Sequence, residues 1–178
     1  MLALLLLLCG CCDSSAMPRE GSFMSTRTDS SGLEYRNQLA AAIRQSDRIV
    51  LTEHSYPYDA YDSHAGKSLI PDEVVYGTRE LNGDQSDAFL STVQGLDPQT
   101  QDAYAACIFE PHHTLRFYAG GELVSTMEIC FKCAQVKWDA TDLTPPWSLL
   151  SGLATVVQGA GFSPERDWAG LAERHLKR

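Results

Sequence analysis

Apolar and polar residues alternate most regularly between positions 114 and 138. In the runs 115–118 and 123–131 the apolar side chains fall on odd-numbered positions, which is typical of strands with one buried face. The members of this set are Leu115, Phe117, Leu123, Met127, Ile129 and Phe131. Gly120-Gly121 lies between the runs and predicts a β-hairpin. A two-residue turn would set odd positions opposite even ones, so we expect an odd-numbered loop or a bulge there, with a glycine at positive φ.

Patterns on both sides of this hairpin predict an α+β fold. Four helices are predicted. The first covers 33–48, with Ser30 or Ser31 as its cap, and the second is capped by Asp84 and ends at Gly95. The third has its apolar face at 147–157, and the fourth covers 165–176 with Ser163 as its cap. The further strands are 49–51, 73–77 and 135–139, and 55–71 is predicted to be a long surface loop. We therefore expect an antiparallel sheet, with a hairpin and meander over 113–139, covered by helices in a single domain spanning 33–178.

The N-terminal residues indicate export. Residues 1–8 read MLALLLLL, which makes about 12 Å of helix, far less than the roughly 30 Å needed to span a bilayer, but enough for a signal peptide. Leu8-Cys9-Gly10-Cys11 resembles a bacterial lipobox. That resemblance implies a signal peptide over 1–10, a lipid on Cys11, and a mature protein anchored to a membrane of the cell envelope and facing the periplasm. The alternative is an ordinary secretory signal.

The segment after the lipobox is rich in serine and has few residues to bury. Such a composition predicts a disordered tether over 11–32 that holds the domain away from the membrane. The whole chain of 178 residues carries 14 Lys+Arg against 23 Asp+Glu, a formal net charge of −9. This charge argues against a nucleic-acid partner, because binding to phosphates needs clustered basic residues.

Candidate chemistry is concentrated between positions 107 and 133. The pattern is Cys-x4-His-His-x16-Cys-x2-Cys, and Cys107, His113, Cys130 and Cys133 form a ligand set suited to zinc, the one cofactor that the pattern indicates. In an oxidising compartment the same residues favour a disulfide from Cys107 to Cys130 or Cys133, with one buried thiol left over. A redox-active Cys-x2-Cys is the third interpretation. Both the zinc site and a Cys130–Cys133 bond need a turn between those residues, because residues three apart on a strand face opposite sides.

The residues from Cys107 through Pro111-His112-His113 to Ile129-Cys130-Phe131-Lys132-Cys133 resemble a group of bacterial exported proteins. These proteins share a Cys before a Pro-Arg/His-His segment, a glycine-centred hairpin, and then Ile-Cys-Phe-x-Cys. The resemblance implies that these residues belong together in one domain. It implies no activity or substrate.

Two functions remain open from the sequence. The first is a membrane-anchored lipoprotein whose non-catalytic domain is a binding, inhibitor or immunity-type module for an unknown protein or small ligand in the envelope. The loop over 53–62 favours it, because its tyrosines suit a contact surface and its aspartates suit a basic partner. The alternative is a metal-binding or thiol-redox protein that uses the Cys107/His113/Cys130/Cys133 cluster. The sequence itself indicates no enzymatic reaction.

Overall fold

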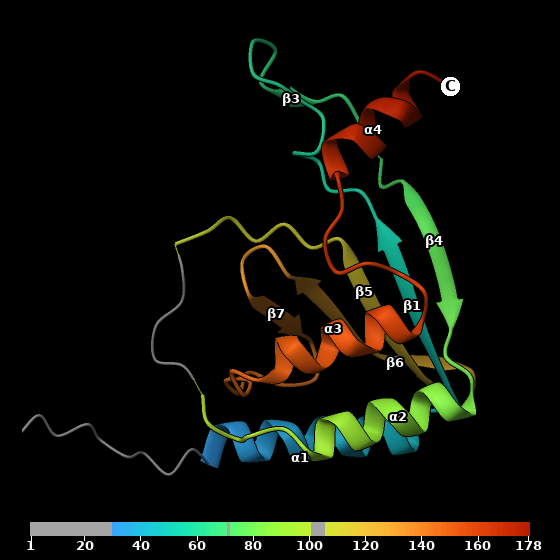
Figure 1. Cartoon of the computed structure of the whole chain (residues 1–178), viewed down its shortest axis with the longest axis vertical. Coiled ribbons are helices and arrows are strands. Elements are labelled where there is room, and N and C mark those ends of the chain that lie inside the picture. The colour runs from blue at the N-terminus through green and yellow to red at the C-terminus, as the bar shows by residue number, and fades with distance from the viewer. Residues whose placement is uncertain (1–29, 71, 101–105) are drawn as a thin grey trace, which may run out of the picture.

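The computed structural model describes residues 30–70, 72–100 and 106–178. The expected signal peptide, the expected lipid attachment site Cys11 and most of the expected tether therefore lie outside the described residues. Within them, the central element is a five-stranded antiparallel sheet of order β4-β1-β5-β6-β7 (Figure 1). Its strands are β1 Arg48–His54, β4 Val75–Glu80, β5 His113–Ala119, β6 Glu122–Cys130 and β7 Gln135–Trp138.

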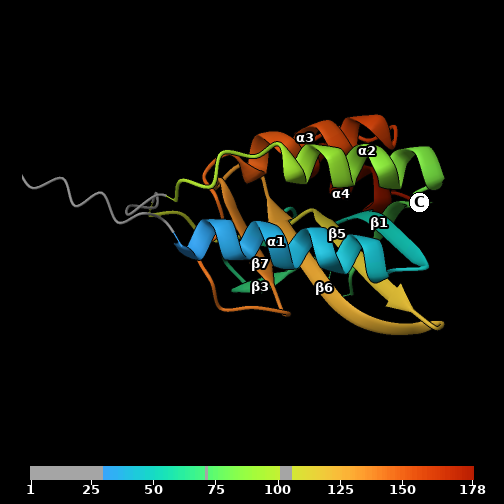
Figure 2. The ribbon, with the colours of Figure 1, turned by 90° about the horizontal axis from the view of Figure 1, so that it is seen from below.

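Three helices cover one face of this sheet, as expected for an α+β domain. They are α1 Ser30–Gln45, α2 Gly83–Gln94 and α3 Leu149–Gly159, and α2 lies beside both of the others (Figure 2). Apolar side chains from all three helices form one core with the apolar side chains of the strands, represented by Leu39, Phe89, Leu153, Leu115 and Met127. Burial of these side chains is the main source of stability of the fold. No helix in the described part of the chain is long and apolar enough to cross a membrane.

The remaining elements lie at the end of the sheet that faces away from α1 and α2. They are the short hairpin β2 Tyr61–Asp62 and β3 Lys67–Ser68, and the C-terminal helix α4 Trp168–Leu176 (Figure 1). The segment 55–71 was expected to be a loop without strands, and in this respect the prediction was wrong. Strands of two residues are too short to produce a visible alternation in the sequence.

The expected irregularity in the hairpin is present as a bulge. Gly120 and Gly121 form a two-residue turn, with Ala119 opposite Glu122, and both glycines have positive φ. The register shifts between Phe117 and Tyr118, which sets odd positions opposite odd ones in the rest of the ladder. The core face predicted from the alternation is thereby confirmed for most of its length. Leu123 is the exception, because it lies on the turn side of the bulge and is exposed.

The helix boundaries differ from the predicted ones at three N-termini. Helix α1 begins at Ser30, and Gly32 is buried, so the last three residues of the expected tether belong to the folded domain. The cap of α2 is Asn82 rather than Asp84, and a reciprocal hydrogen bond with Gln85 completes a capping box. The last helix starts at Trp168, three residues later than predicted, with Asp167 as its cap.

Candidate functional site

The chemistry-bearing residues of the Cys/His pattern gather at one end of the sheet. Glu53, near the end of β1, lies opposite His113, the first residue of β5, and His113 in turn lies opposite Ile129. Cys130 ends β6. Antiparallel pairing thus brings together residues that are far apart in the sequence, at the end of the sheet where α4 begins (Figure 1).

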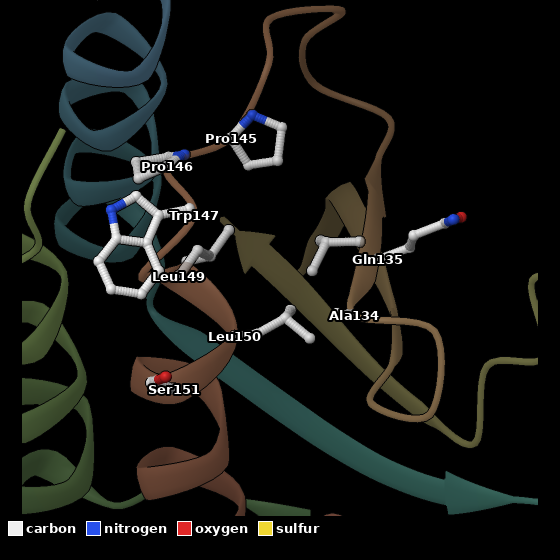
Figure 3. Close-up of a pocket in the computed structure, with 9 residues that line it drawn as sticks. Ala134, Gln135, Pro145, Pro146, Trp147, Leu149, Leu150 and Ser151 are labelled. Carbon is white, nitrogen blue, oxygen red and sulfur yellow. The ribbon is translucent and has the colours of Figure 1, made fainter. Parts of the chain in front are cut away.

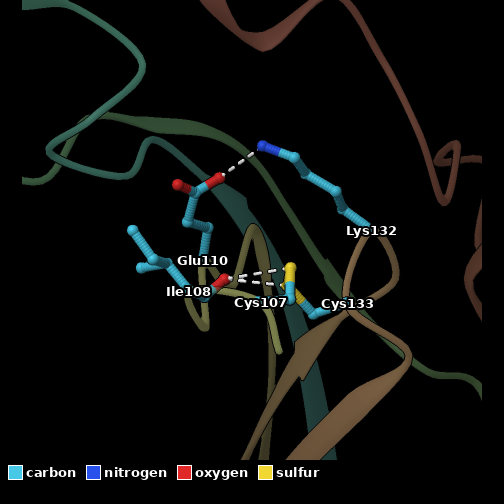
Figure 4. The surroundings of a disulfide bond; sticks show 5 residues. All are labelled: Cys107, Ile108, Glu110, Lys132 and Cys133. Atoms are coloured by element: carbon cyan, nitrogen blue, oxygen red, sulfur yellow. Dashed lines mark hydrogen bonds and ion pairs between the residues drawn. A yellow bond between two sulfur atoms is a disulfide. The ribbon is translucent and has the colours of Figure 1, made fainter. Parts of the chain in front are cut away.

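Cys107 and Cys133 form a disulfide bond with a Cα–Cα distance of 5.7 Å (Figure 4). Cys133 reaches Cys107 because the chain turns between β6 and β7, where Ala134 adopts a φ of 51°. Beside the disulfide, Lys132 Nζ lies 2.8 Å from Glu110 Oε2, so an ion pair joins the same two segments. The disulfide alternative of the sequence analysis is the one this structure contains.

The four residues expected to bind zinc are not assembled into one site. The disulfide uses the sulfur atoms of Cys107 and Cys133, and Cys130 is a separate, buried free thiol. In the described residues no group of three or more His, Cys, Asp or Glu side chains is arranged to hold a metal ion. A redox pair between Cys130 and Cys133 is likewise absent here, because Cys133 is bonded to Cys107.

His113 lies instead beside the buried Glu53, which pairs with the partly exposed Arg166. The side chain of Glu53 is 1% exposed, and its Oε2 accepts a hydrogen bond from the Arg166 guanidinium. His113 Nε2 lies 3.8 Å from Glu53 Oε1, and its side chain is 0% exposed. Neither ring nitrogen of His113 nor Oε1 of Glu53 makes a hydrogen bond within the described chain. Buried polar atoms without partners cost free energy, so the fold tolerates a local penalty at this cluster.

The surroundings of His113 favour the neutral ring. The pKa of His113 is lowered to about 4; burial is the largest cause, and the nearby His112 and His54 contribute in the same direction. The Ser163 backbone opposes this shift, and the Arg166 charge adds to it. At neutral pH the ring is therefore uncharged beside the Glu53–Arg166 pair.

Acid is expected to destabilise the protein through His113. Since the pKa of His113 in the folded state lies below its ordinary value of 6.5, the unfolded chain binds more protons between these two values. The free energy of unfolding should therefore fall as the pH drops from 6.5 to 4, by roughly 2–3 kcal/mol for a shift of this size. Urea titrations of His113→Gln should show a shallower pH slope than wild type. The exposed-histidine control His64→Gln should keep the wild-type slope, and equal slopes for all three proteins would contradict the prediction.

The neighbouring His112 ties three segments together. Its Nε2 donates to Asp59 Oδ1 at 2.8 Å, and its ring stacks on Trp168 with centroids 4.2 Å apart. Asp59 Oδ2 also accepts from the Tyr56 backbone N–H at 2.7 Å. The loop after β1, the start of β5 and the start of α4 are thus held in contact. The Cys/His pattern of the sequence includes His112, but nothing in the sequence indicated that Trp168 is its stacking partner.

Three tyrosines, Tyr56, Tyr58 and Tyr61, form an aromatic cluster in the segment that follows β1. The rings of Tyr58 and Tyr61 meet edge to face at 5.2 Å, and those of Tyr56 and Tyr58 at 5.7 Å. Tyr58 and Tyr61 are 49% and 45% exposed, although aromatic side chains are usually more buried. We call Tyr56, Tyr58 and Tyr61 the tyrosine surface. It is the part of the predicted 53–62 contact loop that remains accessible.

The aspartates of that loop make contacts within the chain. Asp59 is engaged with His112, and its side chain is only 7% exposed. Asp62 Oδ1 accepts hydrogen bonds from the backbone N–H groups of His64 and Ala65 at 2.9 and 3.0 Å. Both carboxylates therefore stabilise the loop itself.

A cavity lies away from the tyrosine surface, between the start of β7 and the start of α3. Its volume is about 540 Å³, and Pro145, Pro146, Trp147 and Leu150 line it. Figure 3 shows Leu150 directed into the space between the two elements, while the side chain of Gln135 points away. No titratable side chain is among its described lining residues. It supplies apolar volume without charged groups. We place the candidate site at the tyrosine surface, where exposed aromatic side chains lie beside the His112–Asp59 hydrogen bond.

Comparisons of the chain with models of known protein families, with curated proteins and with solved structures each found no match. A proposal for its function therefore rests on the geometry of this chain.

Proposed function

We propose that this protein is a membrane-anchored lipoprotein whose domain is a non-catalytic binding module, of the inhibitor or immunity type, facing the cell envelope. The observation that carries this proposal is the tyrosine surface. Tyr58 and Tyr61 offer rigid, amphipathic contact area at low entropic cost, as tyrosines do in many protein interfaces. The loop that holds them is fixed by the Asp59–His112 hydrogen bond, so the surface is preorganised for binding.

The buried cluster supports a binding role more than a catalytic one. A general acid or base must reach the proton that it transfers. His113 and Glu53 are almost fully enclosed and are covered by Arg166 and Trp168. Their position suits the role of supporting the loop that carries the tyrosine surface.

Two features support export. The disulfide between Cys107 and Cys133 is of a kind that persists in oxidising compartments. The lipobox-like Leu8-Cys9-Gly10-Cys11 supplies an anchor for such a protein. The alternative, a metal-binding or thiol-redox function of the cysteine cluster, gains no support from a bonded Cys107–Cys133 pair and a buried Cys130.

Membrane fractionation tests the anchor. Wild-type protein is expected in the membrane pellet, and Cys11→Ala is expected to move to the soluble exported fraction, because one residue would carry the lipid. Cys12→Ala is the matched control and should stay with the membrane. Equal recovery of Cys11→Ala and wild type in the pellet would contradict the lipid anchor.

Photo-crosslinking in cells tests the binding surface. A photoreactive benzoylphenylalanine at position 61 of the full chain is expected to give one discrete protein adduct, and the same group at the exposed position Val124 should give none. Tyr58→Ala should remove the adduct, because Tyr58 contacts Tyr61, while Leu123→Ala at an exposed apolar site should leave it intact. The same adducts at positions 61 and 124, or none at either, would overturn the proposed function.

A further inference from the structure

A second cavity, of about 200 Å³, lies directly beside the tyrosine surface. Tyr56 belongs both to that surface and to the cavity lining, so the two are continuous. Part of the wall is apolar and comes from Pro57, Ile70 and Pro111. Pockets for drug-sized ligands span about 300–1,000 Å³, so this cavity has room for a single side chain rather than for a nucleotide or a folded segment.

Carboxylates dominate the polar part of the cavity. They belong to Asp72, Glu73 and Glu128, and no lysine or arginine is among the described residues that line the space. Glu128 lies between the core residues Met127 and Ile129 on β6, so strand alternation directs it to the sheet face opposite the helices. No ion pair joins Asp72 or Glu128 to any residue that the structure describes. Lys137 lies opposite Glu128 on β7, but its ammonium group lies over the Phe109 ring, 4.2 Å from the ring centroid, and forms no ion pair with Glu128.

The one basic side chain in the lining is a buried histidine with both ring nitrogens occupied. His54 Nδ1 donates to the Ser55 carbonyl at 3.0 Å, and Nε2 is hydrogen-bonded to the Thr114 hydroxyl at 2.8 Å. Glu73 Oε2 also lies 3.4 Å from Nδ1. The three carboxylates outnumber this one histidine, so the lining of the cavity carries a net negative charge. The pKa of Tyr56 agrees with this, because burial, Tyr58 and the Glu110 and Glu128 charges all raise it.

We propose that this cavity receives a lysine or arginine side chain of the partner protein that binds the tyrosine surface. The alkyl part of such a side chain suits the walls formed by Pro57, Ile70 and Pro111, and its cationic end suits Glu73 and Glu128. The Tyr56 ring adds an aromatic face that attracts cations. The inference rests on the proposed function, and it adds the chemistry of the partner, a protein with a protruding basic residue next to an interface.

Binding of n-butylammonium, which reproduces the end of a lysine side chain, tests the cavity. NMR titration of the full chain should show saturable shifts at Tyr56 and His54 with butylammonium and none with the neutral n-butanol. Glu128→Gln is expected to weaken this binding about fivefold, the effect of losing one partly exposed charge contact. Glu122→Gln, which removes an exposed carboxylate at the other end of the same strand, should leave it unchanged. Equal shifts with butylammonium and butanol would overturn the inference.

The crosslinked adduct from position 61 tests whether the cation comes from the partner protein. In the double variant Glu73→Gln/Glu128→Gln the adduct should fall at least fivefold, while circular dichroism shows an unchanged fold. A full-strength adduct in this variant would overturn the inference and leave the proposed function standing, even if butylammonium binds. Absence of the adduct from the wild-type chain would overturn the proposed function itself, and the inference with it.

Discussion

Replacing Arg166 with alanine is expected to lower the free energy of unfolding by about 3 kcal/mol, because the change leaves a buried charge without its counter-charge. Glu53 is 1% exposed, and the Arg166 guanidinium is its only ion-pair partner with a permanent charge among the described residues. The Arg166 side chain is 38% exposed, so water reaches part of it, whereas the Glu53 carboxylate is enclosed. The expected loss of stability therefore comes from Glu53.

Chemical denaturation of two further variants separates this effect from loss of packing. Glu53→Gln/Arg166→Ala should recover part of the stability lost in Arg166→Ala, because no buried charge remains. Arg174→Ala removes an exposed arginine from α4, 3.9 Å from Asp167, and should cost less than about 0.5 kcal/mol. A loss below about 1 kcal/mol for Arg166→Ala would show that Glu53 does not depend on this partner.

Loss of the disulfide is the second large effect expected. Cys107→Ser should lower the free energy of unfolding by about 3 kcal/mol, because the bond closes a loop and restricts the unfolded chain. The two cysteines are 26 positions apart in the sequence. Wild-type protein treated with a thiol reductant should unfold at the same denaturant concentration as Cys107→Ser.

Comparing the effects of a thiol reductant and a metal chelator on stability distinguishes this disulfide from a metal site at the same residues. A chelator should leave wild-type stability unchanged, whereas it would destabilise a protein held by bound zinc. Cys130→Ala is the matched control and should keep the sensitivity to reductant, because Cys130 takes no part in the bond. A wild-type protein that responds to chelator and not to reductant would contradict the disulfide.

The sheet was predictable because alternation reports which face of a strand is buried. The odd-numbered residues Leu115, Phe117, Met127 and Ile129 are all fully buried, and the phase conflict at Gly120-Gly121 correctly required a bulge or an odd loop. Alternation cannot locate the bulge itself. The bulge separates Leu123 from the regular part of the ladder and leaves its side chain exposed, and no residue near Leu123 indicates where the bulge lies.

The helix starts were less predictable because several neighbouring residues can serve as caps. Asn82 and Asp84 are both good N-cap residues, and the choice depends on Gln85, whose side chain also bonds to the Gly159 carbonyl of α3. The start of α4 depends in the same way on Trp168, which stacks on His112. Such contacts between distant segments override local preference.

The candidate site was only partly visible in the sequence. A disulfide from Cys107 was one of three interpretations of the Cys/His pattern, and its partner was left open between Cys130 and Cys133; the bond is to Cys133. The Glu53–Arg166 pair joins residues 113 positions apart, and a lone glutamate and a lone arginine carry no motif. The acidic cavity was hidden for the same reason, since Glu73 and Glu128 meet only when β4 and β6 are placed in one sheet.

Strand β1 is hydrogen-bonded between β4 and β5, although the β2–β3 hairpin, β4 and α2 separate it from β5 along the chain. The strands β5, β6 and β7, by contrast, follow one another directly. Closing short loops costs less entropy, so during folding the β5–β6–β7 meander should form first and β1 should join it later. Until then β5 presents an unpaired edge, and such an edge is a template for pairing with another chain. The interval before β1 arrives is therefore when the folding chain is most exposed to aggregation.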